Sequence, residues 1–138
     1  SVTVYDRARS ATSIMRPDDV DWDDLFGRRG VRWFHTGGIF TALSASTREV
    51  VLAAMRSAKR AGTFVSYDLN FRSKMWDSET AIRTTRPLIE FIDCLIGNEE
   101  DFQLCLGIEG PEAGSRRRRE PPGSARRPTP RTRPTAAR

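Results

Sequence analysis

The chain has 138 residues, enough for one domain with one hydrophobic core, and its formal net charge is +5. Residues 1–110 hold 14 Lys or Arg against 16 Asp or Glu, whereas residues 111–138 hold nine Arg against two Glu. Two cysteines are too few for a disulfide framework, and no apolar run is long enough to span a membrane. The composition therefore argues against a disulfide-rich or membrane protein and favours a cytoplasmic one with reduced thiols.

The first third of the chain predicts two strands and an acidic connection. Val2 and Val4 alternate with polar or aromatic neighbours, which indicates a half-exposed strand at residues 2–5. The acidic segment 18–24 is typical of a loop with a short helix. A short strand follows at residues 31–35, and we expect Thr36-Gly37-Gly38 to end it.

The next segment carries the clearest helix signal of the chain. Ser46 and Glu49 have the spacing of a capping box, in which both side chains satisfy free N–H groups of the first turn. Lysine and arginine in the last turn suit the helix dipole, and Gly62 offers a left-handed stop. The apolar residues fall on one helix face: Val51, Ala54, Met55 and Ala58.

The rest of the body continues as alternating strands and helices. Residues 63–68 form an apolar, β-branched and aromatic run, as expected of a strand covered on both faces. The remaining expected features are a helix capped by Asp77 or Ser78, its kink or division at Pro87, a strand at residues 94–96, and a helix at residues 101–106 that Gly107 stops.

This alternation predicts a doubly wound, mostly parallel α/β sheet with helices on both faces. In such sheets ligands bind outside the carboxyl ends of the strands. Three polar clusters lie at those ends: residues 35–38, Asp68-x-Asn70-x-Arg72 and Asn98-x-x-Asp101. His35 is the only histidine and has no metal-ligating neighbours, so we interpret it as a strand-end residue rather than a ligand.

Residues 111–138 contain no large apolar side chain and are interpreted as a disordered Arg- and Pro-rich tail. Their restriction to residues with GC-rich codons also suggests out-of-frame translation. Arg116–Arg119 leave open an alternative in which the chain is a non-catalytic remnant whose tail binds nucleic acid. The tail has no aromatic residue for base stacking, which argues against a nucleic-acid partner.

Three motifs of the body resemble those of the PfkB, or ribokinase-type, carbohydrate kinases. They are Asp68-Leu-Asn70-Phe-Arg72-x-x-x-Trp76, Gly97-Asn98-Glu99-Glu100-Asp101 and Tyr5-Asp6-Arg7. Within that family they are most like 2-keto-3-deoxygluconate kinases and related sugar-acid kinases. The resemblance covers about residues 1–110 and implies a partial ribokinase-like domain there, with a remnant of the family's small β-sheet lid.

The resemblance also implies a small-molecule sugar or sugar acid as the substrate. Tyr5 and Arg7 would lie on the lid side and contact it. Family members often have a second Tyr where this chain has Asp6, so the identity of the sugar stays open.

The two other motifs imply a site for ATP and Mg²⁺. By resemblance, Asn70 and Arg72 would approach the ATP phosphates, and Asn98 would serve the phosphate and metal region. Asp101 would be the metal-site carboxylate, at a position where the family usually has Glu, and Glu100 beside it keeps the cluster acidic.

Two family motifs do not occur in this sequence. The early Gly-Gly sugar-binding motif would precede residue 1, and the late Gly-Ala-Gly-Asp motif supplies the anion hole and the general-base Asp. We therefore expect the intact protein to be an ATP-dependent sugar kinase and this chain alone to be inactive. Whether the intact protein forms a homo-oligomer stays open.

Overall fold

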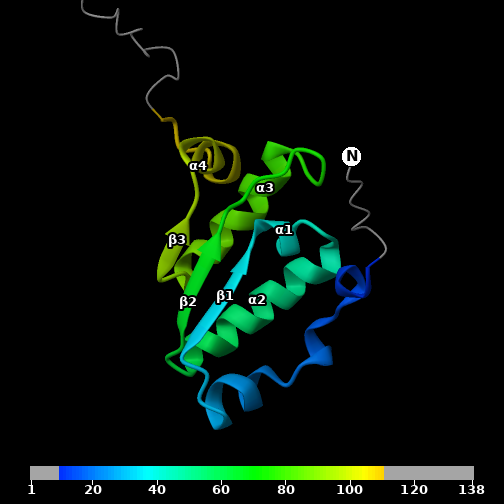
Figure 1. Cartoon of the computed structure of the whole chain (residues 1–138), viewed down its shortest axis with the longest axis vertical. Coiled ribbons are helices and arrows are strands. Elements are labelled where there is room, and N and C mark those ends of the chain that lie inside the picture. Colours follow the sequence, from blue (N-terminus) through cyan, green and yellow to red (C-terminus); the bar gives the residue numbers. More distant parts are fainter. Residues whose placement is uncertain (1–9, 111–138) are drawn as a thin grey trace, which may run out of the picture.

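The computed structural model describes residues 10–110 (Figure 1). The strand predicted at residues 2–5 and the tail at residues 111–138 lie outside the described residues. The strands are β1 (Trp33–Gly37), β2 (Phe64–Asp68) and β3 (Cys94–Ile96). The α-helices are α1 (Gly38–Thr41), α2 (Ala45–Arg60), α3 (Ser78–Thr85) and α4 (Glu99–Leu106). Short 3-10 or π-helical turns are η1 (Ala11–Ile14), η2 (Pro17–Asp19), η3 (Asp24–Arg28) and η4 (Arg86–Phe91).

The three strands form one parallel sheet in the order β1-β2-β3. Trp33 pairs with Phe64 at the start of the β1–β2 ladder, and Gly37 pairs with Asp68 at its end. The strands alternate with helices along the chain, as the sequence predicted. All three carboxyl ends therefore lie at the same edge of the sheet.

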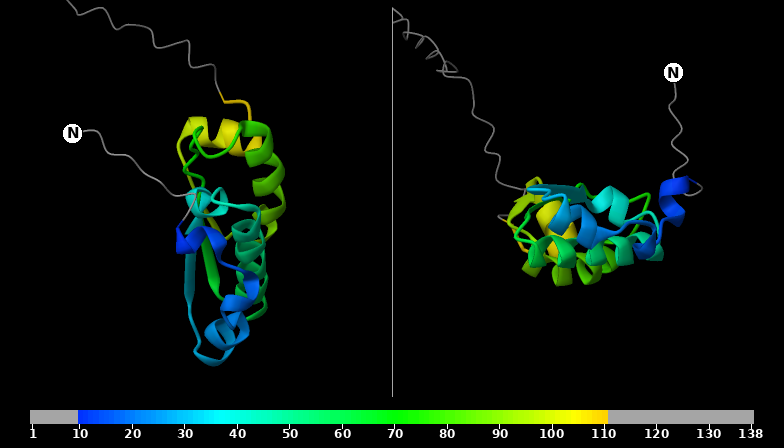
Figure 2. Two further views of the ribbon diagram at one scale, coloured as in Figure 1. Left: turned by 90° about the vertical axis from the view of Figure 1, so that its right-hand side faces the viewer. Right: turned by 90° about the horizontal axis from the view of Figure 1, so that it is seen from below.

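The helices lie over one face of this sheet, as the two views of Figure 2 show. The sequence predicted helices on both faces, and within residues 10–110 that second layer is absent. Large apolar side chains on the open face are consequently exposed: Trp33 by 64%, Phe64 by 41% and Ile96 by 46%. The expectation that β2 is covered on both faces is wrong at Phe64, whereas Ser66 is buried beneath its β1 neighbours.

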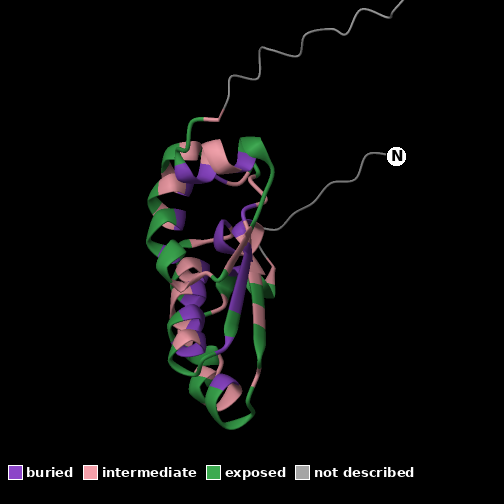
Figure 3. Ribbon diagram, turned by 90° about the vertical axis from the view of Figure 1, so that its left-hand side faces the viewer, coloured by how far each residue is buried: buried purple, intermediate pink, exposed green. Residues whose placement is uncertain are grey.

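The predicted apolar face of α2 is confirmed. Val51, Ala54, Met55 and Ala58 are all buried, and Figure 3 shows the buried side of α2 turned toward the sheet. These side chains share one core cluster with Val65 and the residues around it. The helix ends at Arg60, two residues before a glycine with positive φ.

The predicted capping box of α2 is wrong. The N-cap is Ser44, whose hydroxyl accepts from the Thr47 N–H, while the Thr47 hydroxyl accepts from the Ser44 N–H. Ser46 instead donates its hydroxyl to the carbonyl of Met15. The spacing of Ser46 and Glu49 fits the motif, but the extended backbone that a cap requires lies at Ser44.

Strand β1 starts at Trp33, two residues later than predicted, and continues to Gly37, two residues beyond the predicted end. Thr36 and Gly37 pair in register with Tyr67 and Asp68 and therefore belong to the strand. A glycine is required at the end of the ladder, because a Cβ on Gly37 would lie 2.6 Å from the Asp68 carbonyl oxygen.

The elements of the second half match their predictions closely. Asp77 caps α3 by accepting from the Thr80 N–H, and the helix ends before Pro87, where η4 takes over. Helix α4 begins two residues earlier than predicted, because Asn98 is its N-cap. It ends at Gly107, whose φ of 64° is left-handed. Among the described residues, no helix combines the length and apolarity that crossing a membrane requires.

Candidate functional site

The three predicted polar clusters meet at the carboxyl edge of the sheet. The loop after β2 lies between the turn that follows β1 and the turn that follows β3. On the β3 side, the Leu69 N–H donates to the Ile96 carbonyl at 2.8 Å. On the β1 side, the space that a Cβ of Gly38 would need is occupied by the Leu69 carbonyl oxygen. The backbone of Leu69 is therefore held from both sides.

Asp101 holds the same loop two residues further on. Its Oδ1 accepts from the Phe71 N–H at 2.9 Å, and its Oδ2 accepts from the Asn98 N–H at 3.2 Å. The Asn98 side chain completes the α4 capping box by accepting from the Asp101 N–H at 2.8 Å. Asp101 is only 8% exposed. Backbone N–H donors therefore satisfy both oxygens of a carboxylate that is largely shielded from water.

Asn70 and Arg72 project from this loop as the sequence placed them. Asn70 has a φ of 36°, a left-handed conformation that Asn tolerates better than most residues because its short side chain hydrogen-bonds locally. Arg72 is exposed, and its Nη1 donates to the Phe71 carbonyl at 2.8 Å. An exposed guanidinium beside a fixed backbone can turn toward an anionic ligand.

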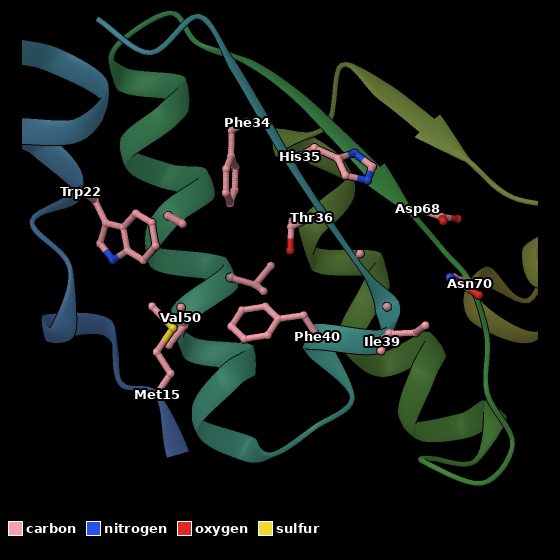
Figure 4. A pocket seen from close by; sticks show the side chains of 14 residues that line it. Met15, Trp22, Phe34, His35, Thr36, Ile39, Phe40, Val50, Asp68 and Asn70 are labelled. Carbon is pink, nitrogen blue, oxygen red and sulfur yellow. The ribbon is translucent and has the colours of Figure 1, made fainter. Parts of the chain in front are cut away.

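An open cavity of about 480 Å³ lies beside this edge (Figure 4). One end is polar and is formed by His35, Asp68 and Asn70, while the other end is apolar. The volume is in the range of small-molecule sites. The remaining lining residues are Met15, Trp22, Phe34, Thr36, Gly37, Gly38, Ile39, Phe40, Val50, Val51 and Ala54.

Asp68 lines the cavity, although no ligand contact was predicted for it from the sequence. Its place at the end of a buried strand was the signal available, because side chains at that position face the ligand edge. His35 also lines the cavity, and its Nδ1 lies 2.8 Å from the Ser66 hydroxyl. The Trp33 Nε1–H donates to that same hydroxyl at 2.8 Å, so His35 is held by a side-chain network.

The described residues do not gather a metal-ligand set: none of their His, Cys, Asp and Glu side chains form a group of three or more that could hold a metal ion. Both oxygens of Asp101 already accept from backbone N–H groups, which does not suit a direct Mg²⁺ ligand. Glu100 is exposed beside it. Metal binding by Asp101 and Glu100 stays a prediction, as do the phosphate contacts of Asn98.

The remaining predicted site residues, Tyr5 and Arg7, lie outside the described residues.

Two titratable side chains of the core, Tyr67 and Cys105, have pKa values above their ordinary range. Burial raises the pKa of the Tyr67 hydroxyl to about 12, and that hydroxyl donates to Thr41 Oγ1 at 2.9 Å. Burial also raises the pKa of the Cys105 thiol to about 11, with a smaller contribution from the charge of Asp101. Both groups are neutral at pH 7 and belong to the core.

No family model matches the chain, but individual proteins do. A 2-dehydro-3-deoxygalactonokinase of Haloferax volcanii is 35% identical over 107 residues, which are 78% of this chain and 33% of that protein. The crystal structure of a 2-dehydro-3-deoxygluconokinase from Thermotoga maritima matches with a TM-score of 0.73 and 40% identity, over 78% of this chain and 32% of that one. The chain belongs to the PfkB carbohydrate kinase family.

Two further matches support the PfkB assignment. A PfkB family carbohydrate kinase from Listeria grayi has a TM-score of 0.71 and 32% identity, over 80% of this chain and 34% of that one. A 2-dehydro-3-deoxygluconokinase of Thermoproteus tenax is 34% identical over 119 residues, or 85% of this chain and 34% of that protein. The predicted family and its likeness to 2-keto-3-deoxygluconate kinases are thereby confirmed. The chain spans about a third of the length of these relatives.

Proposed function

We propose that the intact protein is a sugar-acid kinase that transfers the γ-phosphoryl group of ATP to a hydroxyl of its substrate with Mg²⁺. The relatives named as kinases of 2-dehydro-3-deoxy sugar acids support the substrate class. The observation that carries the proposal is the meeting of three strand-end segments around Asn70 at one edge of a parallel sheet.

The chemistry of phosphoryl transfer suits this arrangement. The transfer needs positioning and charge neutralisation more than covalent participation by the protein. Arg72 offers a guanidinium that can bind two phosphate oxygens at once, and the Asn70 amide can donate a further hydrogen bond. Both groups stand on a loop whose backbone is fixed on either side, which limits the entropy lost when a ligand binds.

Magnesium would neutralise charge on the nucleotide phosphates when bound. Glu100 is an exposed carboxylate of this region and could hold such an ion through its waters. Asn98 and Asp101 would act in the same region by ordering the turn that presents Glu100.

The sugar-binding residues are proposed by resemblance alone. Tyr5 and Arg7 would contact the sugar acid, and Arg7 would complement its carboxylate. We place the protein in the cytoplasm, in line with two cysteines that are both free in the structure.

A chimera tests the proposal. Residues 10–110 would replace the matching segment of the Thermotoga maritima kinase, to which this chain is 40% identical over the superposed part. We expect the chimera to phosphorylate 2-keto-3-deoxygluconate with ATP and Mg²⁺, and the Arg72→Ala chimera to lose most of that activity. A folded chimera that binds neither ATP nor the sugar acid would refute the proposal.

The purified chain provides the second arm. The Gly-Ala-Gly-Asp motif does not occur in its sequence, so we expect no phosphorylation of 2-keto-3-deoxygluconate by the chain alone. Measurable ATP-dependent phosphorylation by the purified chain would show that a general base lies elsewhere in it.

A further inference from the structure

Asp101 makes more hydrogen bonds than a helix cap requires. A capping box uses one side-chain acceptor at the third helical position, and here Oδ2 fills that role by accepting from the Asn98 N–H. The other oxygen, Oδ1, accepts from the Phe71 N–H, which lies 30 residues earlier in the chain. Asp101 therefore connects the first turn of α4 to the loop after β2.

The Phe71 N–H has no strand partner, since β2 ends at Asp68. A part-buried backbone donor without a partner costs free energy, so the Asp101 carboxylate is the group that satisfies it. This bond fixes the peptide between Asn70 and Phe71. The peptide between Asp68 and Leu69 is fixed as well, because the Leu69 N–H donates to the Ile96 carbonyl.

Leu69 and Asn70 thus lie between two anchored peptides, and Asn70 adopts a left-handed φ of 36°. For a residue other than glycine this conformation is held in place by its surroundings rather than by its own preference. Releasing the Phe71 N–H would let Asn70 relax, and the backbone that carries the side chains of Asn70 and Arg72 would lose its fixed position.

We propose that Asp101 is a positioning residue, which holds the Phe71 N–H and thereby fixes Asn70 and Arg72 at the edge of the sheet. Its link to phosphate binding rests on the proposed kinase function, but its hold on the loop does not. A carboxylate with both oxygens engaged in this way acts on the ligand through the loop rather than by direct contact.

Amide hydrogen exchange on the full 138-residue chain tests the hold. In the wild type the Phe71 amide should exchange at least ten times more slowly than the exposed Ser73 amide in the same loop. In Asp101→Ala the Phe71 amide should speed up about tenfold, while the Val65 and Tyr67 amides of β2 keep their rates. Asp101→Asn retains one acceptor oxygen and should give an intermediate rate.

Two controls separate positioning from capping and from charge. Asn98→Ala removes the side-chain acceptor of the cap but leaves the Asp101–Phe71 bond, so α4 amides should speed up while Phe71 stays within about twofold. Glu99→Gln removes one exposed charge from the same helical turn and should leave Phe71 unchanged. If Phe71 exchanges freely in the wild type, or speeds up equally in Asn98→Ala and Asp101→Ala, the proposal is wrong.

Titration with MgATP adds the functional arm. If the wild type binds MgATP, Asp101→Ala should bind it about ten times more weakly and Glu99→Gln within about twofold. Equal binding by wild type and Asp101→Ala would overturn the positioning role. If the wild type does not bind MgATP, the proposed function fails at this site, and the exchange rates still decide whether Asp101 holds the loop.

Discussion

The Lys59 ammonium lies 2.6 Å from Oδ1 of Asp93, and Oδ2 of the same carboxylate accepts from the Val65 N–H at 2.8 Å. Lys59 is in the last turn of α2, Val65 is in β2, and Asp93 directly precedes β3. One carboxylate therefore links three elements at the end of the sheet opposite the candidate site. The hydrogen bond from Lys59 and then that from Val65 hold the pKa of Asp93 below its ordinary value.

Because the pKa of Asp93 is lower in the folded state, the contribution of its carboxylate to the free energy of unfolding depends on pH. The stabilisation is present above the unfolded-state pKa of about 3.9 and is lost as pH falls through the lower folded-state pKa. We expect Asp93→Ala to lower the free energy of unfolding by about 1 kcal/mol at pH 7 and by much less at pH 2. Urea unfolding at the two pH values measures this difference in the free energy of unfolding. Lys59→Met keeps the hydrogen bond between Val65 and Asp93, so it should lose less stability than Asp93→Ala. An equal loss at both pH values would contradict the assignment.

Gly38 sets how closely the β1 and β2 ends can approach. A Cβ at this position would overlap the Leu69 carbonyl oxygen, so Gly38→Ala must displace the loop that carries Asn70. We expect a loss of about 3 kcal/mol in the free energy of unfolding. Gly27→Ala is the matched control, because a Cβ there meets nothing within 4 Å, and it should be neutral or slightly stabilising. Similar stabilities for the two variants in urea unfolding would rule out a tight approach at Gly38.

Tyr67 carries its hydroxyl into the core, where it donates to Thr41 Oγ1. Tyr67→Phe should lower the free energy of unfolding by about 1 kcal/mol at pH 7. Burial raises the folded-state pKa to about 12 against about 10 in the unfolded chain, so the stability of the wild type should fall as pH rises from 10 to 12. Unfolding experiments at pH 7 and 10.5 should show a smaller fall in the free energy of unfolding for Tyr67→Phe than for the wild type. An equal fall in both proteins would refute the link between this pH dependence and Tyr67.

The open face of the sheet should promote self-association. Phe64 and Ile96 expose apolar surface there, and the ring of Trp33 meets that of Phe64 edge to face with centroids 5.0 Å apart. Replacing Phe64 and Ile96 by Thr places a β-branched residue with good strand propensity at each position and should reduce light scattering by the concentrated protein. Ile14→Thr, at an exposed position in η1, is the control and should scatter like the wild type. Unchanged scattering in the double variant would exclude this face as the cause.

Local patterns were sufficient to predict most elements of the described fold. The apolar spacing from Val51 to Ala58 predicted a helix and its buried face, and Gly107 predicted the end of α4. The α2 cap was misplaced because the Ser46 hydroxyl is engaged by Met15, which is 31 residues away in the chain. A spacing rule contains no such tertiary contact.

The same limit applies to the candidate site. The Asn98-x-x-Asp101 spacing places a carboxylate three residues after an amide, which predicts a cap or a ligand cluster equally well. Only the packing of β2 beside β3 brings that carboxylate to the Phe71 N–H. The open sheet face was not predicted, because the apolar run at residues 63–68 indicates that both faces of the strand are apolar but does not say which part of a chain covers them.

Arg72 provides the most direct test of phosphate binding at the sheet edge. Arg72→Ala should weaken MgATP binding about tenfold, because a charge-assisted bidentate contact to phosphate oxygens is lost. Arg72→Lys keeps the positive charge but lacks the planar guanidinium, so its affinity for MgATP should lie between those of the wild type and Arg72→Ala. Lys74→Ala removes a cation of the same exposed loop and should change the affinity by less than about twofold. Calorimetric titrations at two salt concentrations measure these affinities; equal weakening by Arg72→Ala and Lys74→Ala would mean that the loop attracts ATP by net charge rather than through the Arg72 guanidinium.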